Sequence, residues 1–134
     1  MANPRTETLP IRVGEDVVRA RHLVRKLAIE LKFSLVDQTK IVTAASELAR
    51  NTLDHGGGGN MKIAAIESNG RSGLQLTFSD KGPGIPDITL ALKEGYTTGG
   101  GLGLGLSGAK KLSNDFHLVS KVGEGTEVTI TRWR

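Results

Sequence analysis

The chain has 134 residues, enough for one domain with its own hydrophobic core, so we expect a single domain over residues 1–134 with residues 1–8 as a loose tail. With no cysteine, no apolar run of about 20 residues and no signal-peptide core, the sequence excludes a disulfide framework and predicts a cytoplasmic protein that does not enter a membrane. A net charge of +4 does not by itself indicate nucleic acid, since the basic residues are spread out and one Trp, one Tyr and three Phe offer few stacking platforms.

Hydrophobic periodicity predicts, in chain order, a strand, two helices, a hairpin, a short helix, a further helix and a second hairpin. Alternation marks the expected strands Leu9–Val13, Met61–Glu67, Leu74–Phe78, Phe116–Lys121 and Glu127–Arg132. Three-and-four spacing marks the expected helices Asp16–Leu31, Ser34–Thr52, Ile88–Lys93 and a stretch of about 12 residues ending at Asp115. Helices early and strands late favour an α+β two-layer sandwich over a parallel doubly wound sheet.

The expected helix ends carry recognisable caps. Asp16 is the expected N-cap of the first helix, and either Ser34 or Asp37 caps the second. The four glycines from Gly56 are expected to end the second helix, because glycine readily adopts the backbone conformation that closes a helix.

Glu47 and Asn51 lie four residues apart on the second helix, so their side chains project from one face. The neighbouring stripe is apolar, and a buried acid and amide need partners unless they face a ligand cavity. An amide oxygen can bind Mg²⁺, and a carboxylate one turn away can accept a proton from an attacking hydroxyl. The alternative is that Glu47 pairs with Arg50 or with water on a solvated face.

Three segments rich in glycine follow the helices. Asp80-Lys81-Gly82-Pro83-Gly84-Ile85-Pro86 directly follows a strand, where glycines permit a sharp turn or the close approach of a ligand, and where a carboxylate can accept a hydrogen bond from an adenine amine. A simple tight turn is the alternative. Gly123-Glu124-Gly125-Thr126 suits an ordinary hairpin turn, although the Thr126 hydroxyl could also meet a base.

The stretch Gly99-Gly100-Gly101-Leu102-Gly103-Leu104-Gly105 runs into the start of a helix and would present backbone N–H groups to phosphates. Gly103, Gly105 and Gly108 match the dinucleotide-binding spacing, but a loop precedes them where that motif needs a strand. No Gly-Lys pair supports a P-loop, and no His-Arg-Asp or Asp-Phe-Gly supports a eukaryotic-type kinase. A flexible hinge is the remaining alternative.

In this order, the segments Ser46–Asn51, Asp80–Pro86, Gly99–Gly105 and Gly123–Thr126 resemble the four boxes of the GHKL, or Bergerat-fold, ATPase and kinase superfamily. Within it the chain is similar to the bacterial anti-sigma regulatory serine/threonine kinases, and among these to the RsbT-type switch kinases. The resemblance implies a two-layer α/β sandwich with helices on one face of a mixed, largely antiparallel sheet and ATP between the layers.

The resemblance also implies a role for each matching position. These roles are Glu47 as general base; Asn51 as Mg²⁺ ligand; Asp80 as the acid that reads adenine; Gly82, Gly84 and Ile85 as the adenine loop; Gly99, Gly100, Gly101, Leu102, Gly103, Leu104 and Gly105 as the phosphate lid; and Thr126 as the hydroxyl beside the base.

The implied activity is transfer of the ATP γ-phosphoryl group to Ser or Thr of a STAS-domain antagonist, after which the released kinase would activate a PP2C-type phosphatase. Related kinases bind sigma factors, so a sigma factor is a further candidate partner. The segment Thr97–Leu106 contains no basic residue, whereas some relatives carry one in the lid. An ATP-gated protein-binding module with little catalysis is therefore the alternative function.

Overall fold

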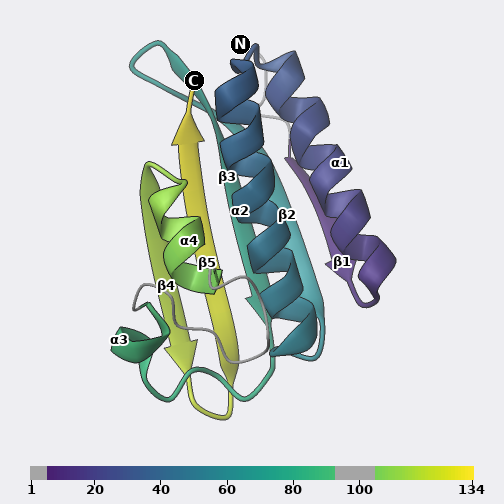
Figure 1. The fold of residues 1–134 in the computed structure, drawn as a ribbon, viewed down its shortest axis with the longest axis vertical. Helices are drawn as coiled ribbons and strands as arrows, with labels where there is room; N and C mark the ends of the chain where they lie inside the picture. The colour runs from purple at the N-terminus through teal and green to yellow at the C-terminus, as the bar shows by residue number, and fades with distance from the viewer. Residues whose placement is uncertain (1–5, 93–104) are drawn as a thin grey trace.

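A computed structural model of the chain describes residues 6–92 and 105–134 (Figure 1). Within these ranges the chain forms strands and helices whose bounds are β1 Thr6–Ile11, α1 Gly14–Glu30, α2 Leu35–Asp54, β2 Gly59–Ser68, β3 Arg71–Asp80, α3 Ile88–Ala91, α4 Gly105–Lys111, β4 Asp115–Lys121 and β5 Gly125–Trp133. The α+β class is confirmed. Within the described ranges, no helix is both long and apolar enough to cross a lipid bilayer.

The five described strands form one sheet in the order β1-β2-β3-β5-β4. Every pair of neighbours in that order is antiparallel. The expected mixed sheet is therefore antiparallel in all its described strand pairs, because β4 and β5 form a hairpin and β5 inserts between β3 and β4. This insertion brings the end of β3 beside the start of β5, although the two are distant in sequence.

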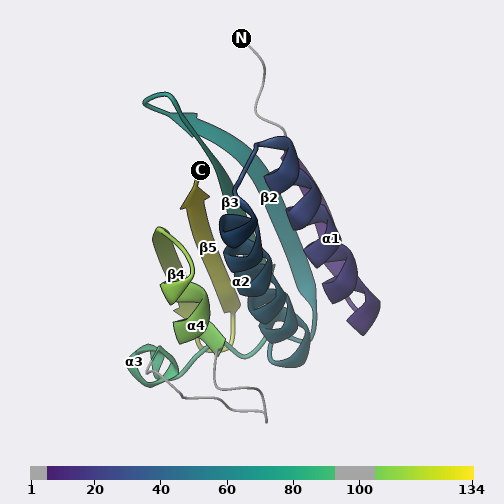
Figure 2. The ribbon, with the colours of Figure 1, turned by 45° about the horizontal axis from the view of Figure 1, so that its top comes forward.

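The helices α1, α2 and α4 cover one face of the sheet, as both views show (Figures 1 and 2). The strands explain this arrangement, since Leu74, Leu76 and Phe78 of β3 all point to that face and are buried. The opposite face is polar. Its cross-strand contacts join Gln75 to Thr131 at 3.4 Å, Thr77 to Thr129 at 3.2 Å and Ser79 to Glu127 at 3.3 Å.

The start of α1 differs from the expectation. Val13 is the N-cap, and Asp16 lies within the first turn instead of preceding it. The Asp16 carboxylate accepts hydrogen bonds from the backbone N–H groups of Arg12 at 2.9 Å and Val13 at 3.1 Å, and these bonds hold its pKa below the ordinary value. Asp16 therefore stabilises the helix start by reaching backwards, as the acid of a capping box does.

Ser34 is confirmed as the N-cap of α2, because its hydroxyl accepts a hydrogen bond from the Asp37 N–H at 3.1 Å. The helix ends at Asp54, just before the glycines expected to end it. The predicted C-terminal end of the last helix is wrong. Helix α4 ends at Lys111, and Asp115 belongs to β4. The Ser113 hydroxyl binds the carbonyls of the last helical turn and so helps to end the helix.

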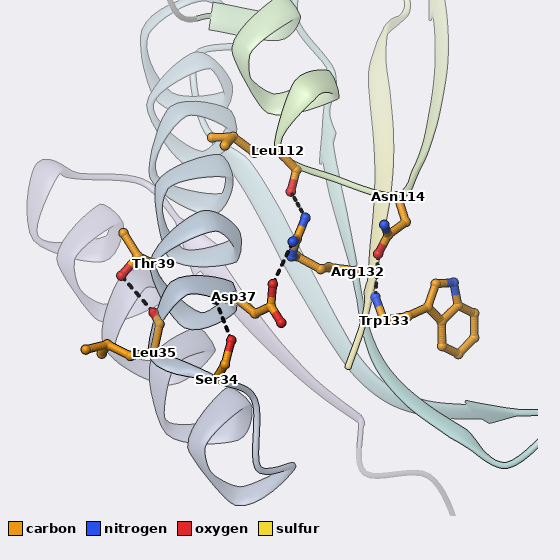
Figure 3. A network of polar contacts seen from close by, with 8 residues as sticks. All are labelled: Ser34, Leu35, Asp37, Thr39, Leu112, Asn114, Arg132 and Trp133. Carbon is orange, nitrogen blue, oxygen red and sulfur yellow. Dashed lines mark hydrogen bonds and ion pairs between the residues drawn. The ribbon is translucent and has the colours of Figure 1, made fainter.

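Arg132 of β5 joins three elements through its guanidinium group (Figure 3). It donates to Asp37 of α2 at 2.6 Å and to the carbonyl of Leu112, just beyond α4, at 3.0 Å. The Arg132 side chain is only 13% exposed and that of Asp37 28% exposed. The hydrogen bond from Arg132 holds the pKa of Asp37 below its ordinary value. This ion pair therefore connects the first turn of α2 with the end of α4 and the sheet.

We expect Asp37→Asn to lower the free energy of unfolding by about 1–3 kcal/mol at pH 7, because Arg132 loses its charged acceptor in a poorly solvated position. The pKa of Asp37 is lowered by folding, so its contribution is present above the unfolded value of about 3.9 and is lost as the pH falls through the folded pKa. The difference between the two proteins in urea denaturation should therefore shrink below about pH 4.

The matched control is Glu15→Gln, since Glu15 is 84% exposed and lies 4.0 Å from Arg19. Its denaturation midpoint should change little at either pH. A stability loss in Asp37→Asn that is the same at pH 7 and pH 3 would contradict this account of the ion pair.

Candidate functional site

A cavity of about 450 Å³ lies where the end of α2 faces the end of β3 and the start of β5. The loop after β3, the helix α3 and the start of α4 complete its wall. Its lining residues are Leu48, Asn51, Thr52, His55, Gly56, Phe78, Asp80, Pro83, Gly84, Ile85, Pro86, Asp87, Ala91, Gly105, Leu106, Thr126 and Val128. A largely apolar cavity of this size with a few polar side chains is typical of a small-molecule site.

The sheet brings two of the predicted site residues together. Asp80 of β3 is paired in register with Thr126 of β5, and Thr126 is paired with Ser120 of β4. The three residues therefore form one row across adjacent strands, which are about 4.8 Å apart. Phe78 and Val128 pair with each other two residues further along the sheet on the same face, and they give the cavity an apolar floor.

Asp80 is held in a fixed orientation by glycines that pack closely around it. Its Oδ1 accepts a hydrogen bond from the Gly82 N–H at 2.9 Å. A Cβ atom on Gly56 would lie 2.4 Å from Asp80 Cγ, and one on Gly125 would lie 2.1 Å from the Asp80 carbonyl oxygen. A Cβ atom on Gly82 would likewise lie 2.7 Å from Gly56 Cα. A side chain on Gly56 would displace the carboxylate, and one on Gly125 or Gly82 would push apart the backbone segments around it.

Within the described residues, Oδ2 of Asp80 receives no hydrogen bond, so it keeps its capacity to accept one from a ligand.

Ser120 was not foreseen from the sequence, yet it orders this end of the cavity. Its hydroxyl lies 2.8 Å from the Thr126 hydroxyl, accepts a hydrogen bond from the Ile85 N–H at 2.8 Å and donates to the Gly125 carbonyl at 3.2 Å. Ser120 thus ties the loop after β3 to the β4–β5 hairpin. The pairing register of that hairpin is the signal that could have identified it, because it places Ser120 beside Thr126.

Glu47 and Asn51 both lie on α2, but they line different hollows. Asn51 lines the cavity, whereas Glu47 lines a second hollow between α1 and α2. Within the described residues Glu47 forms no ion pair with Arg50, so the alternative of a surface pair between them does not describe this structure. The structure thus places Glu47 one helical turn from the cavity and outside its lining.

The remaining predicted site residues divide into two groups. Gly84, Ile85 and Gly105 line the cavity, and Gly82 supports it through Asp80. Six predicted lid residues lie outside the residues that the structure describes: Gly99, Gly100, Gly101, Leu102, Gly103 and Leu104.

The sequence did not identify Thr52, His55 and Gly56 as site residues. They lie at and just after the last turn of α2, and they line the cavity.

The potential metal ligands at the cavity suit an ion that is bound mainly by the substrate and by water. In the part of the chain that the structure describes, no group of three or more His, Cys, Asp or Glu residues could hold a metal ion. Asn51 offers an amide oxygen, and its side chain forms no hydrogen bond with the described residues. One amide ligand fits Mg²⁺, which commonly takes its other ligands from water and substrate phosphates.

Comparisons with known proteins agree on one family. The family model of histidine kinase-, DNA gyrase B- and HSP90-like ATPases matches residues 36–133. The chain is 48% identical over 118 residues to the serine/threonine-protein kinase RsbT of Bacillus subtilis. The aligned region covers 88% of this chain and 89% of that protein. It is 30% identical over 126 residues to an anti-sigma F factor of Geobacillus kaustophilus. This alignment covers 89% of this chain and 85% of that protein.

A solved structure shares the fold. The crystal structure of the RsbU and RsbW domains of a Mycobacterium tuberculosis protein matches with a TM-score of 0.66 and 22% sequence identity. The match covers 99% of this chain and 33% of that chain, and at this identity it speaks for the fold alone.

We expect Gly56→Ala to weaken ATP binding by about tenfold or more, because the new Cβ would displace the Asp80 carboxylate and cost a charge-assisted hydrogen bond to the ligand. Fluorescence titration with a labelled ATP analogue measures the effect. The control is Gly14→Ala, since a Cβ at Gly14 meets nothing within 4 Å. Equal affinities of both variants and wild type would show that the close packing at Asp80 does not govern binding.

Proposed function

The chain belongs to the family of histidine kinase-, DNA gyrase B- and HSP90-like ATPases and is an ATP-dependent protein kinase, and we propose that it phosphorylates a serine or threonine of a STAS-domain antagonist in a bacterial partner-switching module. Once released from that antagonist, the kinase activates a PP2C-type phosphatase. The observation that carries this proposal is the convergence of Asn51, Asp80 and Thr126 on one cavity in a chain 48% identical to a serine/threonine-protein kinase.

In this proposal the adenine base occupies the end of the cavity nearest the sheet. The Asp80 carboxylate accepts a hydrogen bond from the exocyclic amine, and the Thr126 hydroxyl contacts the same edge of the base. The apolar side chains of Phe78, Ile85 and Val128 pack against its faces. Support comes from the row of Asp80, Thr126 and Ser120, whose hydrogen bonds hold the polar groups in place before the ligand binds.

The phosphates then extend from the base towards Asn51 and Gly105, which line the cavity on α2 and at the start of α4. Asn51 supplies an amide oxygen for Mg²⁺. Bound Mg²⁺ would neutralise charge on the phosphates during transfer. Backbone N–H groups at the start of α4 would add hydrogen bonds to the phosphate oxygens.

Glu47 is proposed as the general base. Its carboxylate accepts the proton of the substrate hydroxyl while the hydroxyl oxygen forms a bond to the γ-phosphorus and the bond from that phosphorus to the leaving oxygen of ADP breaks. Glu47 lies one turn from Asn51 on α2, and it forms no ion pair within the described residues that would occupy its oxygens.

The second candidate function is an ATP-gated protein-binding module with little catalysis. One observation favours it: Glu47 lines the hollow between α1 and α2 and does not line the nucleotide cavity. The 30% identity to an anti-sigma F factor supports a sigma factor as a candidate partner in this case.

We expect Glu47→Gln to reduce phosphoryl transfer by about 10²–10⁴-fold while ATP binding stays unchanged, because the amide cannot accept the hydroxyl proton. The measurement is transfer of radiolabelled γ-phosphate from Mg-ATP to the STAS-domain proteins of the organism that encodes this chain.

Asp54→Asn is the control, since Asp54 is an exposed acid at the end of the same helix and lines neither hollow. Full transfer by Glu47→Gln would remove Glu47 from the mechanism. Absence of transfer by the wild type, with ATP still bound, would favour the binding module.

A further inference from the structure

The hollow between α1 and α2 is a groove of about 270 Å³, and it is separate from the nucleotide cavity. Polar side chains dominate its lining: Arg21 and Arg25 on α1, and Thr39, Thr43, Ser46 and Glu47 on α2. No residue of this set lines the nucleotide cavity. We call it the α1–α2 groove.

The two arginines of the α1–α2 groove lie one helical turn apart, so both project towards α2 from the same face of α1. Neither forms an ion pair or a hydrogen bond within the described residues, and neither pairs with Glu47 in the same groove. Arg19 on the same helix, by contrast, binds Asp16 at 3.2 Å. The groove therefore presents two positive charges whose donors bind none of the other described residues.

The opposite wall offers hydroxyl groups beside these charges. The Thr39 hydroxyl is used locally, since it donates to the Leu35 carbonyl at 3.0 Å (Figure 3). The hydroxyls of Thr43 and Ser46 form no hydrogen bond with the described residues, so they can bind a ligand in the groove. The groove therefore combines charged and neutral donors, which suits a carboxylate-bearing peptide segment better than an apolar one.

The α1–α2 groove and the nucleotide cavity lie at successive positions along α2. Residues at four-residue intervals run from the groove towards the cavity: Thr39, Thr43, Glu47 and Asn51 on α2, and His55, which caps its end. The first three line the α1–α2 groove and the last two line the nucleotide cavity. Glu47 thus stands at the junction, about 6 Å along the helix from Asn51.

We propose that the α1–α2 groove binds an acidic segment of the protein substrate, with Arg21 and Arg25 pairing to its carboxylates and Glu47 meeting its hydroxyl at the junction with the nucleotide cavity. This inference rests on the proposed kinase function, because that function assigns Glu47 as the base. It adds the substrate class: a serine or threonine flanked by Asp or Glu. Arginine suits this task because its planar donors bind a carboxylate through two hydrogen bonds.

The direct test is a titration of the whole chain with the peptide Asp-Glu-Ser-Glu-Asp, in which changes in the amide chemical shifts of NMR spectra report binding. We expect shift changes concentrated at residues 21–25 and 39–47, and none with the neutral peptide Asn-Gln-Ser-Gln-Asn. The double variant Arg21→Gln/Arg25→Gln should raise the dissociation constant for the acidic peptide by about tenfold or more. Shifts spread over basic residues elsewhere, such as Arg71 and Lys110, would overturn the inference.

The control variant is Lys26→Gln/Lys62→Gln, which removes the same charge from exposed residues that do not line the groove. It should bind the acidic peptide as the wild type does, and equal weakening in both double variants would overturn the inference in favour of general electrostatic attraction. Peptide binding by this chain without any phosphoryl transfer would leave the groove standing and contradict the kinase function. If Arg21→Gln/Arg25→Gln transfers phosphate with an unchanged KM for the acceptor protein, the kinase function stands and the proposed role of the α1–α2 groove is contradicted.

Discussion

The one-sided sheet is the constraint on which the rest of the structure depends. Along β3, buried apolar side chains alternate with polar ones, so only one face of the sheet can exclude water. The helices must share that face, and α2 packs on its centre with buried Ile41, Ala45 and Leu48. The cavity of the candidate site forms where α2 ends and the apolar face of β3 and β5 continues beyond it, so the same alternation that builds the core also opens this cavity.

Local periodicity was sufficient to predict every described element and its type, because each strand and helix keeps its own hydrophobic pattern over several residues. Element boundaries and strand pairings were harder to predict. The expected loose tail over residues 1–8 is wrong at its end, because β1 begins at Thr6 and pairs with β2 from there. Asp16 looked like a cap from the residue type alone, although its carboxylate bonds to the N–H groups before it. The antiparallel pairing of β3 with β5 depends on contacts about 50 residues apart, which no local pattern specifies.

Part of the candidate site could be predicted because its residues carry unusual chemistry for their positions. Asp80 and Asn51 are polar residues at the edge of apolar patterns, and both line the cavity. Phe78 and Val128 could not be separated from ordinary core residues, since they differ only in lying where the covering helix ends. The position of Glu47 depends on how α1 packs against α2, and this packing is a tertiary property that the four-residue spacing to Asn51 does not contain.

The Arg132 ion pair has a practical consequence for anyone who shortens or fuses this chain. The residue stands two positions before Arg134, yet it bonds to the first turn of α2 and to the carbonyl that follows α4. A fragment trimmed by three residues at this end would lose the contact that joins both helices to the sheet. A fragment boundary after β5 therefore belongs beyond Arg132.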